Sequence, residues 1–260
     1  MKVSIITATD RQLSERAIKS VENQSDKNFE WVVVSDGYES NPMPLFFEDG
    51  TPNRMYNKIK LVSIRNNYGP SVARNIGFQI SDGDIITYLD SDDELSPNRV
   101  KEVIEMFTGF DTKISFSGYN IVQDGQTVEF NPVKYKHMMG ATSDYDYVYN
   151  TLKTQNISIP MGVAHTRDVF AIEGGFQRGI VCGEDGILWR RIVDNLYSNM
   201  VFLSKTNAGT YHVNPDGQSR KQPRFEMGGF AFDGSKRDNG KYLDREWYAT
   251  FNSVNLFDKE

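Results

Sequence analysis

Short apolar runs and amphipathic segments alternate along the chain up to residue 90. The apolar runs have the length of buried strands and cover residues 3–6, 31–34, 61–64 and 85–89. Between them, apolar side chains recur at helical spacing, first at Leu13, Ala17 and Val21 and then at Val72, Ile76 and Ile80. Strands that alternate with helices in this way are typical of an α/β fold with a mostly parallel sheet flanked by helices.

The pattern changes after residue 95. Ser96 as N-cap and Pro97 at the first helical position predict a helix with an apolar face at Val100, Val103, Ile104 and Phe107. Residues 114–117 have the composition of a strand, and residues 120–130 alternate around Asp124-Gly125, which is a strong β-hairpin signal. We therefore expect the sheet to become mixed in this region.

The remaining chain has weaker patterns. Residues 132–149 are polar and aromatic, which predicts a loop or short helices over a surface. A strand is expected to close at Val163 and Ala164, and a short helix to end near Gly174-Gly175. A further helix begins near Glu184 and carries an apolar row at Leu188, Ile192 and Leu196. The segment beyond residue 220, rich in Gly, Lys, Arg and aromatic residues, predicts a flap or a C-terminal extension.

Composition narrows the class of protein. A chain of 260 residues with 38% hydrophobic and 25% charged residues is typical of one compact globular unit. The net charge of -6 provides no broad basic surface, which disfavours general nucleic-acid binding. Cys182 is the only cysteine, so an intrachain disulfide and a cysteine-rich zinc site are excluded and a reducing compartment is expected.

The amino terminus carries no targeting signal that we recognise. Its apolar stretch is too short for a signal sequence, and no other segment approaches the ~20 apolar residues of a membrane-spanning helix. We therefore expect a cytoplasmic protein in which any membrane contact is peripheral.

An acidic cluster follows the apolar run that ends at Leu89. Its sequence is Asp90-Ser91-Asp92-Asp93-Glu94. Ligands of open α/β sheets bind at the carboxyl ends of strands, and Mg²⁺ and Mn²⁺ prefer carboxylate and phosphate oxygens. The cluster predicts a metal site; the alternative is a solvated turn whose charges favour the N-terminus of the next helix.

Asp36 also follows an apolar strand, in the sequence Ser35-Asp36-Gly37. Its carboxylate is placed to accept hydrogen bonds from a base N–H or a ribose hydroxyl. Because Asp-Gly after a strand is also a common turn, a purely structural role is the alternative.

Arg74 lies in the first turns of the helix that follows Asn67-Tyr68-Gly69-Pro70. A helix N-terminus combined with an arginine suits an anionic ligand. The alternative is a well-capped helix with a surface arginine.

Two carboxylates, Glu184 and Asp185, lie between Gly183 and Gly186 at the start of an amphipathic helix. One of them is placed to act as a general base on an acceptor hydroxyl. Acidic residues also favour helix N-termini for electrostatic reasons alone, which is the structural alternative.

Taken in order, residues 3–11, Asp36, residues 69–75, residues 90–93 and Glu184-Asp185 resemble the GT-A-fold glycosyltransferases of family 2. The resemblance covers residues 1–215 and implies a Rossmann-like mixed, mostly parallel sheet in a single domain. Within that domain, residues 1–118 are the expected nucleotide-sugar-binding half and residues 119–215 the acceptor-binding half. Residues 216–260 then form the extension or flap.

The resemblance also implies a reaction, which is inverting transfer of a sugar from a nucleoside-diphosphate sugar to a carbohydrate or other hydroxyl acceptor. Mn²⁺ or Mg²⁺ would bridge the protein and the diphosphate, and UDP is the first expectation for the nucleotide. The implied roles, by position, are the nucleoside pocket for Thr7, Thr9 and Asp36, the ribose or metal-bound phosphates for Asp90, and the metal for Asp92. Asp93 would assist at the metal or at the donor sugar. Arg74, at its helix start, is the candidate for binding the anionic donor. Asp185 would be the base, oriented by Glu184.

The resemblance leaves the roles of two histidines and of the amino-terminal motif open. The family usually has Pro where Thr7 stands and Tyr-Asn where Thr9-Asp10 stand. The segment Tyr211-His212-Val213-Asn214 resembles one that can place a histidine near the metal, and His212 and Asn214 are the two candidates for that place. The alternative for His212 is an ordinary histidine of a strand. His165 is expected either to contact the acceptor or to pack in the core.

Three other functions remain as alternatives. A sugar nucleotidyltransferase also uses paired aspartates, but a glycine-rich basic phosphate loop is missing after the first strand. A NAD-binding enzyme is disfavoured because no G-x-G-x-x-G follows that strand. A non-catalytic sugar-nucleotide or carbohydrate-binding module would keep the fold without turnover. For the acceptor surface, residues 132–156 and the segment beyond Arg220 are the candidates.

Overall fold

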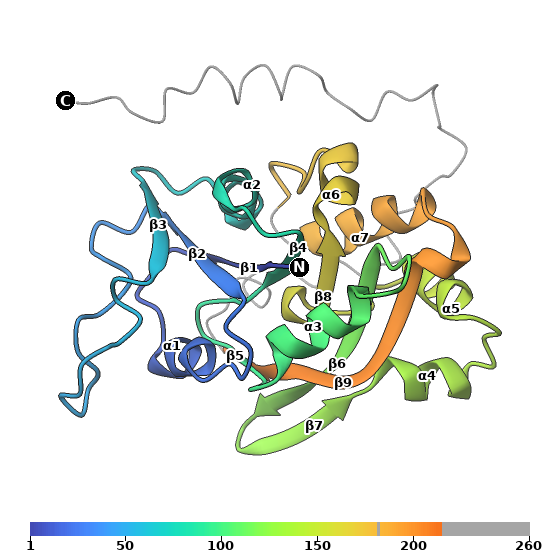
Figure 1. The fold of residues 1–260 in the computed structure, drawn as a ribbon, viewed down its shortest axis with the longest axis horizontal. Helices are drawn as coiled ribbons and strands as arrows, with labels where there is room; N and C mark the ends of the chain where they lie inside the picture. The colour runs from blue at the N-terminus through green and yellow to red at the C-terminus, as the bar shows by residue number, and fades with distance from the viewer. Residues whose placement is uncertain (181–182, 215–260) are drawn as a thin grey trace.

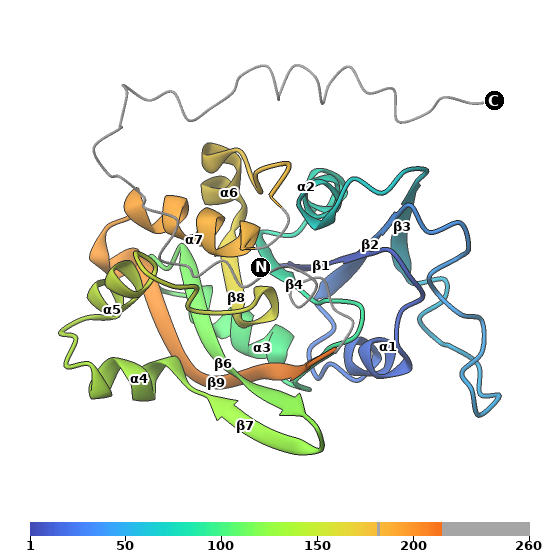
Figure 2. The same ribbon diagram turned by 180° about the vertical axis from the view of Figure 1, so that it is seen from behind.

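The computed structural model describes residues 1–180 and 183–214. Cys182 and the segment 215–260, for which a flap or extension was expected, lie outside the described residues. The described part is built on one mixed sheet of nine strands, in the order β3-β2-β1-β4-β8-β6-β9-β5, with β7 paired to β6. Both views in Figures 1 and 2 show this sheet between two layers of helices.

The amino-terminal half of the sheet is parallel, as predicted. It contains β1 (Val3–Thr9), β2 (Phe29–Asp36), β3 (Ile59–Ile64) and β4 (Ile85–Tyr88), with β1 paired to both β2 and β4. Strands β1, β2 and β4 are buried on both faces, so their apolar runs are continuous, whereas β3 is a partly exposed edge strand. Successive side chains divide between the two faces: Ile5 packs into one core cluster and Ile6 into another.

Helices cover both faces of this half. On one face lie α1 (Glu15–Glu22) and α3 (Arg99–Phe107), and on the other lies α2 (Pro70–Ile80) (Figure 1). The predicted start of α3 is wrong by two residues, because Ser96 and Pro97 form a turn before the helix and Asn98 is the N-cap. The physical reason is that the Ser96 backbone is engaged elsewhere: its N–H donates to Ala208 O at 2.8 Å, and its carbonyl accepts from Arg99 N at 3.0 Å.

The second half of the sheet is mixed, as expected from the hairpin. Strands β6 (Ile114–Gln123) and β7 (Gln126–Phe130) are antiparallel and are joined by Asp124 and Gly125, whose φ angles are 52° and 76°. Positive φ at both positions matches the right-handed twist of a two-residue hairpin. Strand β8 (Val163–Thr166) joins the two halves by pairing antiparallel to both β4 and β6.

Short helices surround this half. Residues 132–149 form α4 (Pro132–Met138) and most of α5 (Asp144–Thr151), which confirms the expectation of short helices. The helix predicted to end near Gly174 is α6 (Arg167–Glu173), and Gly174 caps it in the left-handed conformation. The helix predicted from Glu184 is α7 (Glu184–Asp194), and single 3₁₀ turns occur at Pro160–Gly162 and Ser198–Met200.

Two strands were not predicted. They are β9 (Val201–His212), which pairs parallel to β6, and β5 (Glu94–Leu95), which pairs antiparallel to the far end of β9. The polar residues within β9 gave no clear alternation in the sequence. This long strand places His212 and Asn214 beside the ends of β1 and β4, where the cleft described below lies. In the described part of the chain, no helix is long and apolar enough to cross a membrane.

Candidate active site

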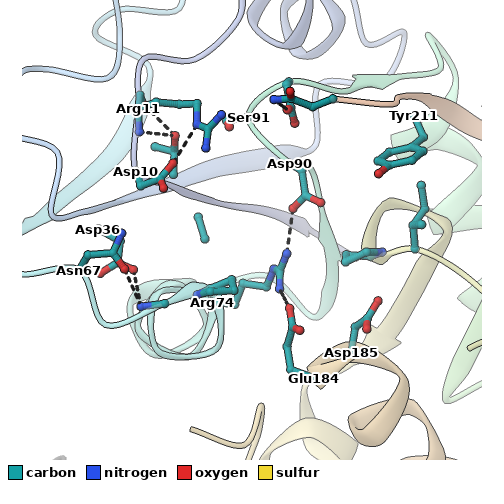
Figure 3. A pocket seen from close by; sticks show the side chains of 18 of the residues that line it. Asp10, Arg11, Asp36, Asn67, Arg74, Asp90, Ser91, Glu184, Asp185 and Tyr211 are labelled. Carbon is teal, nitrogen blue, oxygen red and sulfur yellow. Dashed lines mark hydrogen bonds and ion pairs between the residues drawn. The ribbon is translucent and has the colours of Figure 1, made fainter. Parts of the chain in front are cut away.

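A cleft of about 280 Å³ lies at the carboxyl ends of β1, β2 and β4. Seven parts of the chain line it: the β1–α1 connection, Asp36, the start of α2, the residues after β4, the loop before β8, the start of α7, and the end of β9 with Asn214. Parallel strands end at the same edge of a sheet, so polar residues that follow them converge there. The structure therefore brings together most of the side chains that the sequence singled out (Figure 3).

Asp36 forms part of the cleft wall at the end of β2. Its two carboxylate oxygens accept hydrogen bonds from Tyr68 N at 2.8 Å and Gly69 N at 2.7 Å. The next residue, Gly37, has a φ of 77°, and a Cβ there would lie 2.6 Å from Asn67 N. Burial raises the pKa of Asp36, although the two backbone hydrogen bonds oppose that rise. Asp36 thus fixes the loop before α2 while remaining on the cleft surface.

The two threonines of β1 differ in position. Thr9 lines the cleft, and its hydroxyl donates to Arg11 O at 2.7 Å. Thr7 does not reach the cleft, because it lies two residues further inside the strand, where its buried hydroxyl accepts a hydrogen bond from Trp31 Nε1 at 3.0 Å. The expectation that Thr7 lines the nucleoside pocket is therefore corrected: its contact is with the core.

Arg74 extends from α2 across the floor of the cleft, where Figure 3 shows it between two carboxylates. Its guanidinium donates to Asp90 Oδ1 at 2.9 Å and to Glu184 Oε1 at 2.7 Å. Burial alone disfavours its charge, but the attraction of Asp90 and Glu184 outweighs that cost and raises the pKa of Arg74. Arg74 is therefore a permanent buried cation that joins the two sides of the cleft.

Glu184 and Asp185 lie in the first turn of α7, as the sequence predicted. Asp185 Oδ2 accepts from Asn156 Nδ2 at 2.9 Å, and Oδ1 accepts from Gly186 N at 2.8 Å. Burial and the negative charge of Glu184 raise the pKa of Asp185 to about 6, against the lowering effect of Arg74 and of the two hydrogen bonds. A carboxylate with this proton affinity suits a general base at neutral pH.

The acidic cluster after β4 divides into two environments. Asp90 and Asp92 line the cleft, whereas Asp93 is only 1% exposed and is not among the lining residues. Asp93 Oδ1 accepts from His212 N at 2.9 Å, which ties the acidic loop to the end of β9. Burial and the charges of Asp90 and Asp92 raise the pKa of Asp93 to about 9, so its neutral form is favoured. Asp93 therefore holds the loop rather than facing the cleft.

Side chains at the end of β9 and just beyond it contact the acidic segment that follows β4. His212 Nε2 lies 2.6 Å from Glu94 Oε1, and Asn214 Nδ2 lies 3.5 Å from Asp92 Oδ2. Both residues line the cleft, so either can approach a ligand near Asp92. His165, in contrast, is fully buried and forms a 2.8 Å hydrogen bond with the Tyr88 hydroxyl, which assigns it to the core.

The donor set in the cleft fits a hard divalent cation in part. Asp90 and Asp92 offer the oxygen ligands that Mg²⁺ and Mn²⁺ prefer. Across residues 1–180 and 183–214, however, no group of three or more His, Cys, Asp or Glu side chains is arranged to hold a metal ion. A cation bound here would have to complete its coordination with ligands such as phosphate oxygens or water.

Ile159 and Pro160, from the loop before β8, are cleft residues that the sequence analysis missed. Asn156, which contacts Asp185, lies in the same loop and was included only as the end of the candidate acceptor segment. Tyr211 of β9 lines the cleft, although the sequence named it only as part of the segment that carries His212. No motif with fixed spacing contains the three loop residues, so no local signal distinguished them from other loop residues.

Sequence comparisons agree with this arrangement. The family model "Glycosyl transferase family 2" matches residues 4–170. TuaG of Bacillus subtilis, a putative teichuronic acid biosynthesis glycosyltransferase, is 26% identical over 153 residues, which cover 58% of this chain and 58% of TuaG. AmsB of Erwinia amylovora, an amylovoran biosynthesis glycosyltransferase, is 31% identical over 137 residues, which cover 50% of this chain and 42% of AmsB.

Solved structures show the same fold. Staphylococcus aureus TarS in complex with UDP-GlcNAc has a TM-score of 0.65 at 18% identity and covers 86% of this chain and 62% of that one. The mannosyltransferase PcManGT of Pyrobaculum calidifontis, in complex with GDP-Man and Mn²⁺, has a TM-score of 0.52 at 16% identity and covers 84% and 58%. The chain thus spans less than two thirds of each of these relatives.

These likenesses confirm the expected GT-A fold class. The family model matches more than half of the chain, and its match includes Asp36 at the end of β2, Arg74, and Asp90 in the loop after β4. The chain belongs to glycosyl transferase family 2.

Proposed function

We propose that this chain is an inverting glycosyltransferase that moves a sugar from a nucleoside-diphosphate sugar to a hydroxyl group of an acceptor. One observation carries the proposal: a single cleft contains Asp90 and Asp92 beside Arg74 and, at the start of α7, a buried carboxylate with a raised pKa. Carboxylates for a cation-bound diphosphate and a base for a hydroxyl are the two requirements of this reaction.

For the donor, we propose that the nucleoside lies along Thr9 and Asp36. The carboxylate of Asp36 is already held by Tyr68 N and Gly69 N, so it is oriented before the nucleotide arrives. A uridine nucleotide is the first candidate, because TarS, which binds UDP-GlcNAc, superposes with the higher TM-score of the two neighbours above. GDP-Man is the donor in the other, so guanosine nucleotides belong in the same test.

For the cation, we propose that Asp92 holds Mn²⁺ or Mg²⁺ together with Asp90, with His212 or Asn214 nearby. A bound cation would neutralise the diphosphate and stabilise it as a leaving group. Arg74 contributes on the same side, because its guanidinium fixes the orientation of Asp90 through a 2.9 Å hydrogen bond. Asp93 supports the loop from behind, through His212 N.

For the chemistry, we propose that Asp185 accepts the proton of the acceptor hydroxyl as its oxygen attacks the anomeric carbon. The new C–O bond forms on the face opposite the departing diphosphate, so the configuration inverts. Glu184 acts indirectly, since it is engaged with Arg74 at 2.7 Å and so aligns the start of α7 with the donor side. The acceptor would be selected by residues 132–156, whose helices lie next to α7 and β9.

The test uses Asp185→Asn, which keeps the shape of the side chain and removes its basicity. Release of nucleoside diphosphate from UDP-GlcNAc, UDP-glucose and GDP-mannose, with Mn²⁺ and without an added acceptor, reports donor turnover. We expect the rate to fall by about 10²–10⁴-fold, as for loss of a general base. The Kd for UDP with Mn²⁺, measured by calorimetry, should stay within about twofold of the wild-type value, because Asp185 does not contact the nucleotide in this proposal.

Asp194→Asn is the matched control, since Asp194 ends the same helix and pairs with Arg190 away from the cleft. Its turnover should equal that of the wild type. Unchanged turnover in Asp185→Asn would remove Asp185 as the base. Nucleotide binding by a wild-type chain that turns over none of the donors would instead favour a non-catalytic binding module.

A further inference from the structure

Asn156 is held at both ends of its side-chain amide. Its Nδ2 donates to Asp185 Oδ2 at 2.9 Å, and its Oδ1 accepts from Ser158 N at 3.3 Å. A rotated amide would place an oxygen against the carboxylate and an NH₂ group against a backbone N–H, which are both repulsive. The orientation in which Asn156 donates to Asp185 is therefore the favoured one.

Gly186 leaves the space that Asn156 occupies. A Cβ at position 186 would lie 3.2 Å from Asn156 Cγ and 3.3 Å from its Cβ, so Asn156 would have to move by a few tenths of an ångström. Gly186 lies inside α7 and is not among the positive-φ glycines, so the backbone does not require glycine there. Close approach of Asn156 accounts for its presence.

Asp185 is surrounded by groups of several kinds. Glu184 precedes it on α7, Arg74 on α2 acts on it through its charge, and Tyr119 on β6 has a pKa raised by burial and then by the charge of Asp185. Glu184 and burial favour the protonated carboxyl, whereas Arg74 favours the carboxylate. The Arg74 guanidinium is shared between Asp90 and Glu184, so its hydrogen bonds go to those residues and not to Asp185. The Asn156 amide adds a neutral donor directly on Asp185.

We propose that Asn156 is a positioning residue for Asp185: its amide holds Oδ2 so that the carboxylate stays ionised and aimed into the cleft, and Gly186 provides the room for this contact. The proposal rests on the proposed role of Asp185 as the base. A hydrogen bond to the charged form of a carboxyl group favours that form. Without the amide, Asp185 keeps its place on α7 but holds its proton more tightly and rotates more freely.

The test uses Asn156→Leu, which keeps a similar size and removes the donor without adding charge. The readout is the titration of Asp185, followed by NMR of protein labelled with ¹³C at the aspartate carboxyl carbon and assigned by the signal missing in Asp185→Asn. We expect the Asp185 midpoint to rise by about one pH unit, which is a tenfold increase in proton affinity. An unchanged midpoint in a folded variant would overturn the proposal.

Gly186→Ala is the second variant and keeps Asn156 itself. Alanine is the better helix former, so the helix should persist while Asn156 is displaced. The Asp185 midpoint should shift in the same direction by a smaller amount, and no shift counts against the role of Gly186. Asn199→Leu is the control, because this exposed amide in the 3₁₀ turn Ser198–Met200 contacts Asp111 and not the cleft.

Donor hydrolysis adds a readout that a merely structural role would not produce. In Asn156→Leu the rate of UDP-GlcNAc hydrolysis should fall by about tenfold below the Asp185 midpoint and recover at higher pH. A loss of the same size at every pH would mean that Asn156 only supports the fold. The NMR titration needs no turnover, so it decides the contact even if Asp185→Asn shows that the proposed base is wrong.

Discussion

At the scale of single residues, burial decides which chemistry each charged group of the cleft can perform. Asp185 and Asp93 are both buried carboxyl groups with raised pKa values, about 6 and about 9. The difference follows from their neighbours, because Asp185 has Arg74 and two hydrogen-bond donors nearby, whereas Asp93 is close to the negative charges of Asp90 and Asp92. At neutral pH, Asp185 is mainly a proton acceptor and Asp93 a neutral structural group.

The first prediction concerns the pH dependence of turnover. A general base acts only when it is unprotonated, and Asp185 has a pKa near 6. Turnover should therefore rise with pH through this value, by about tenfold between pH 5 and pH 7, and then level off. Initial rates of nucleotide release at saturating donor measure this directly, with nucleotide affinity at each pH as the control. A rate that is flat from pH 5 to pH 7 would contradict the assignment.

The sequence identified most of the charged residues in the cleft for a local reason. Asp36 ends β2, Asp90 and Asp92 lie in the loop after β4, and Glu184 and Asp185 begin a helix, so their place at the edge of the sheet is set by the pattern around them. Which way a side chain faces depends on packing partners that are distant in sequence. A hydrogen bond from Trp31 Nε1 keeps the Thr7 side chain in the core, and a hydrogen bond from His212 N keeps Asp93 away from the cleft. No pattern in the local sequence indicates either contact.

At the scale of the elements, α2 positions Arg74 because it packs unusually close to the sheet. A Cβ at Gly77 would lie 2.5 Å from Ile6 Cγ2, so a side chain there would collide with β1. Arg74 lies less than one helical turn from Gly77. The close packing of α2 on the sheet therefore places Arg74 over the carboxyl end of β4, where Asp90 begins the acidic loop.

Gly77→Ala provides the second prediction. Alanine improves helix propensity by about 1 kcal/mol, but overpacking of the core costs about 1–3 kcal/mol, so we expect net destabilisation. Displacement of α2 should also move Arg74 and weaken binding of UDP with Mn²⁺. Thermal unfolding and calorimetry measure the two effects. Gln79→Ala, an exposed position on the same helix, is the control and should change neither.

The elements of the first half were predictable because β1, β2 and β4 contain continuous apolar runs and because the helices between the strands show clear periodicity. The hairpin was predictable because Asp124-Gly125 supplies the two positive φ angles that its turn requires. Strand β9 was not predictable, since its polar positions are paired by distant strands rather than by a local pattern. The start of α3 was misplaced for the same kind of reason, because the Ser96 N–H is taken by β9.

At the scale of the whole molecule, both the chain and the cleft carry an excess of negative charge. Carboxylates outnumber guanidinium groups among the lining residues, and Arg74 is already neutralised by two of them. A diphosphate that enters alone meets net negative charge, whereas a cation that enters alone meets too few ligands in the described part of the chain. Each should therefore bind weakly without the other.

The third prediction is that Mn²⁺ and UDP stabilise the protein cooperatively. A ligand at 100 times its Kd stabilises by about 2.7 kcal/mol, which corresponds to an increase in Tm of roughly 5–10 °C for a chain of this size. We expect a shift of that order with both ligands and less than about 2 °C with either one, with EDTA reversing it. Asp92→Asn should abolish the cooperativity. Equal shifts with UDP alone and with UDP plus Mn²⁺ would argue against a cation between Asp92 and the nucleotide.

The uninterrupted sheet beneath the cleft has a mechanical consequence. Strand β8 is hydrogen-bonded to β4 on one side and to β6 on the other, so the two halves of the sheet cannot swing apart without breaking backbone ladders. Substrates are then expected to enter a preformed cleft, and not one that closes by hinge rotation of two lobes. Substitutions in the loops that line the cleft can alter selectivity while the sheet beneath keeps its geometry.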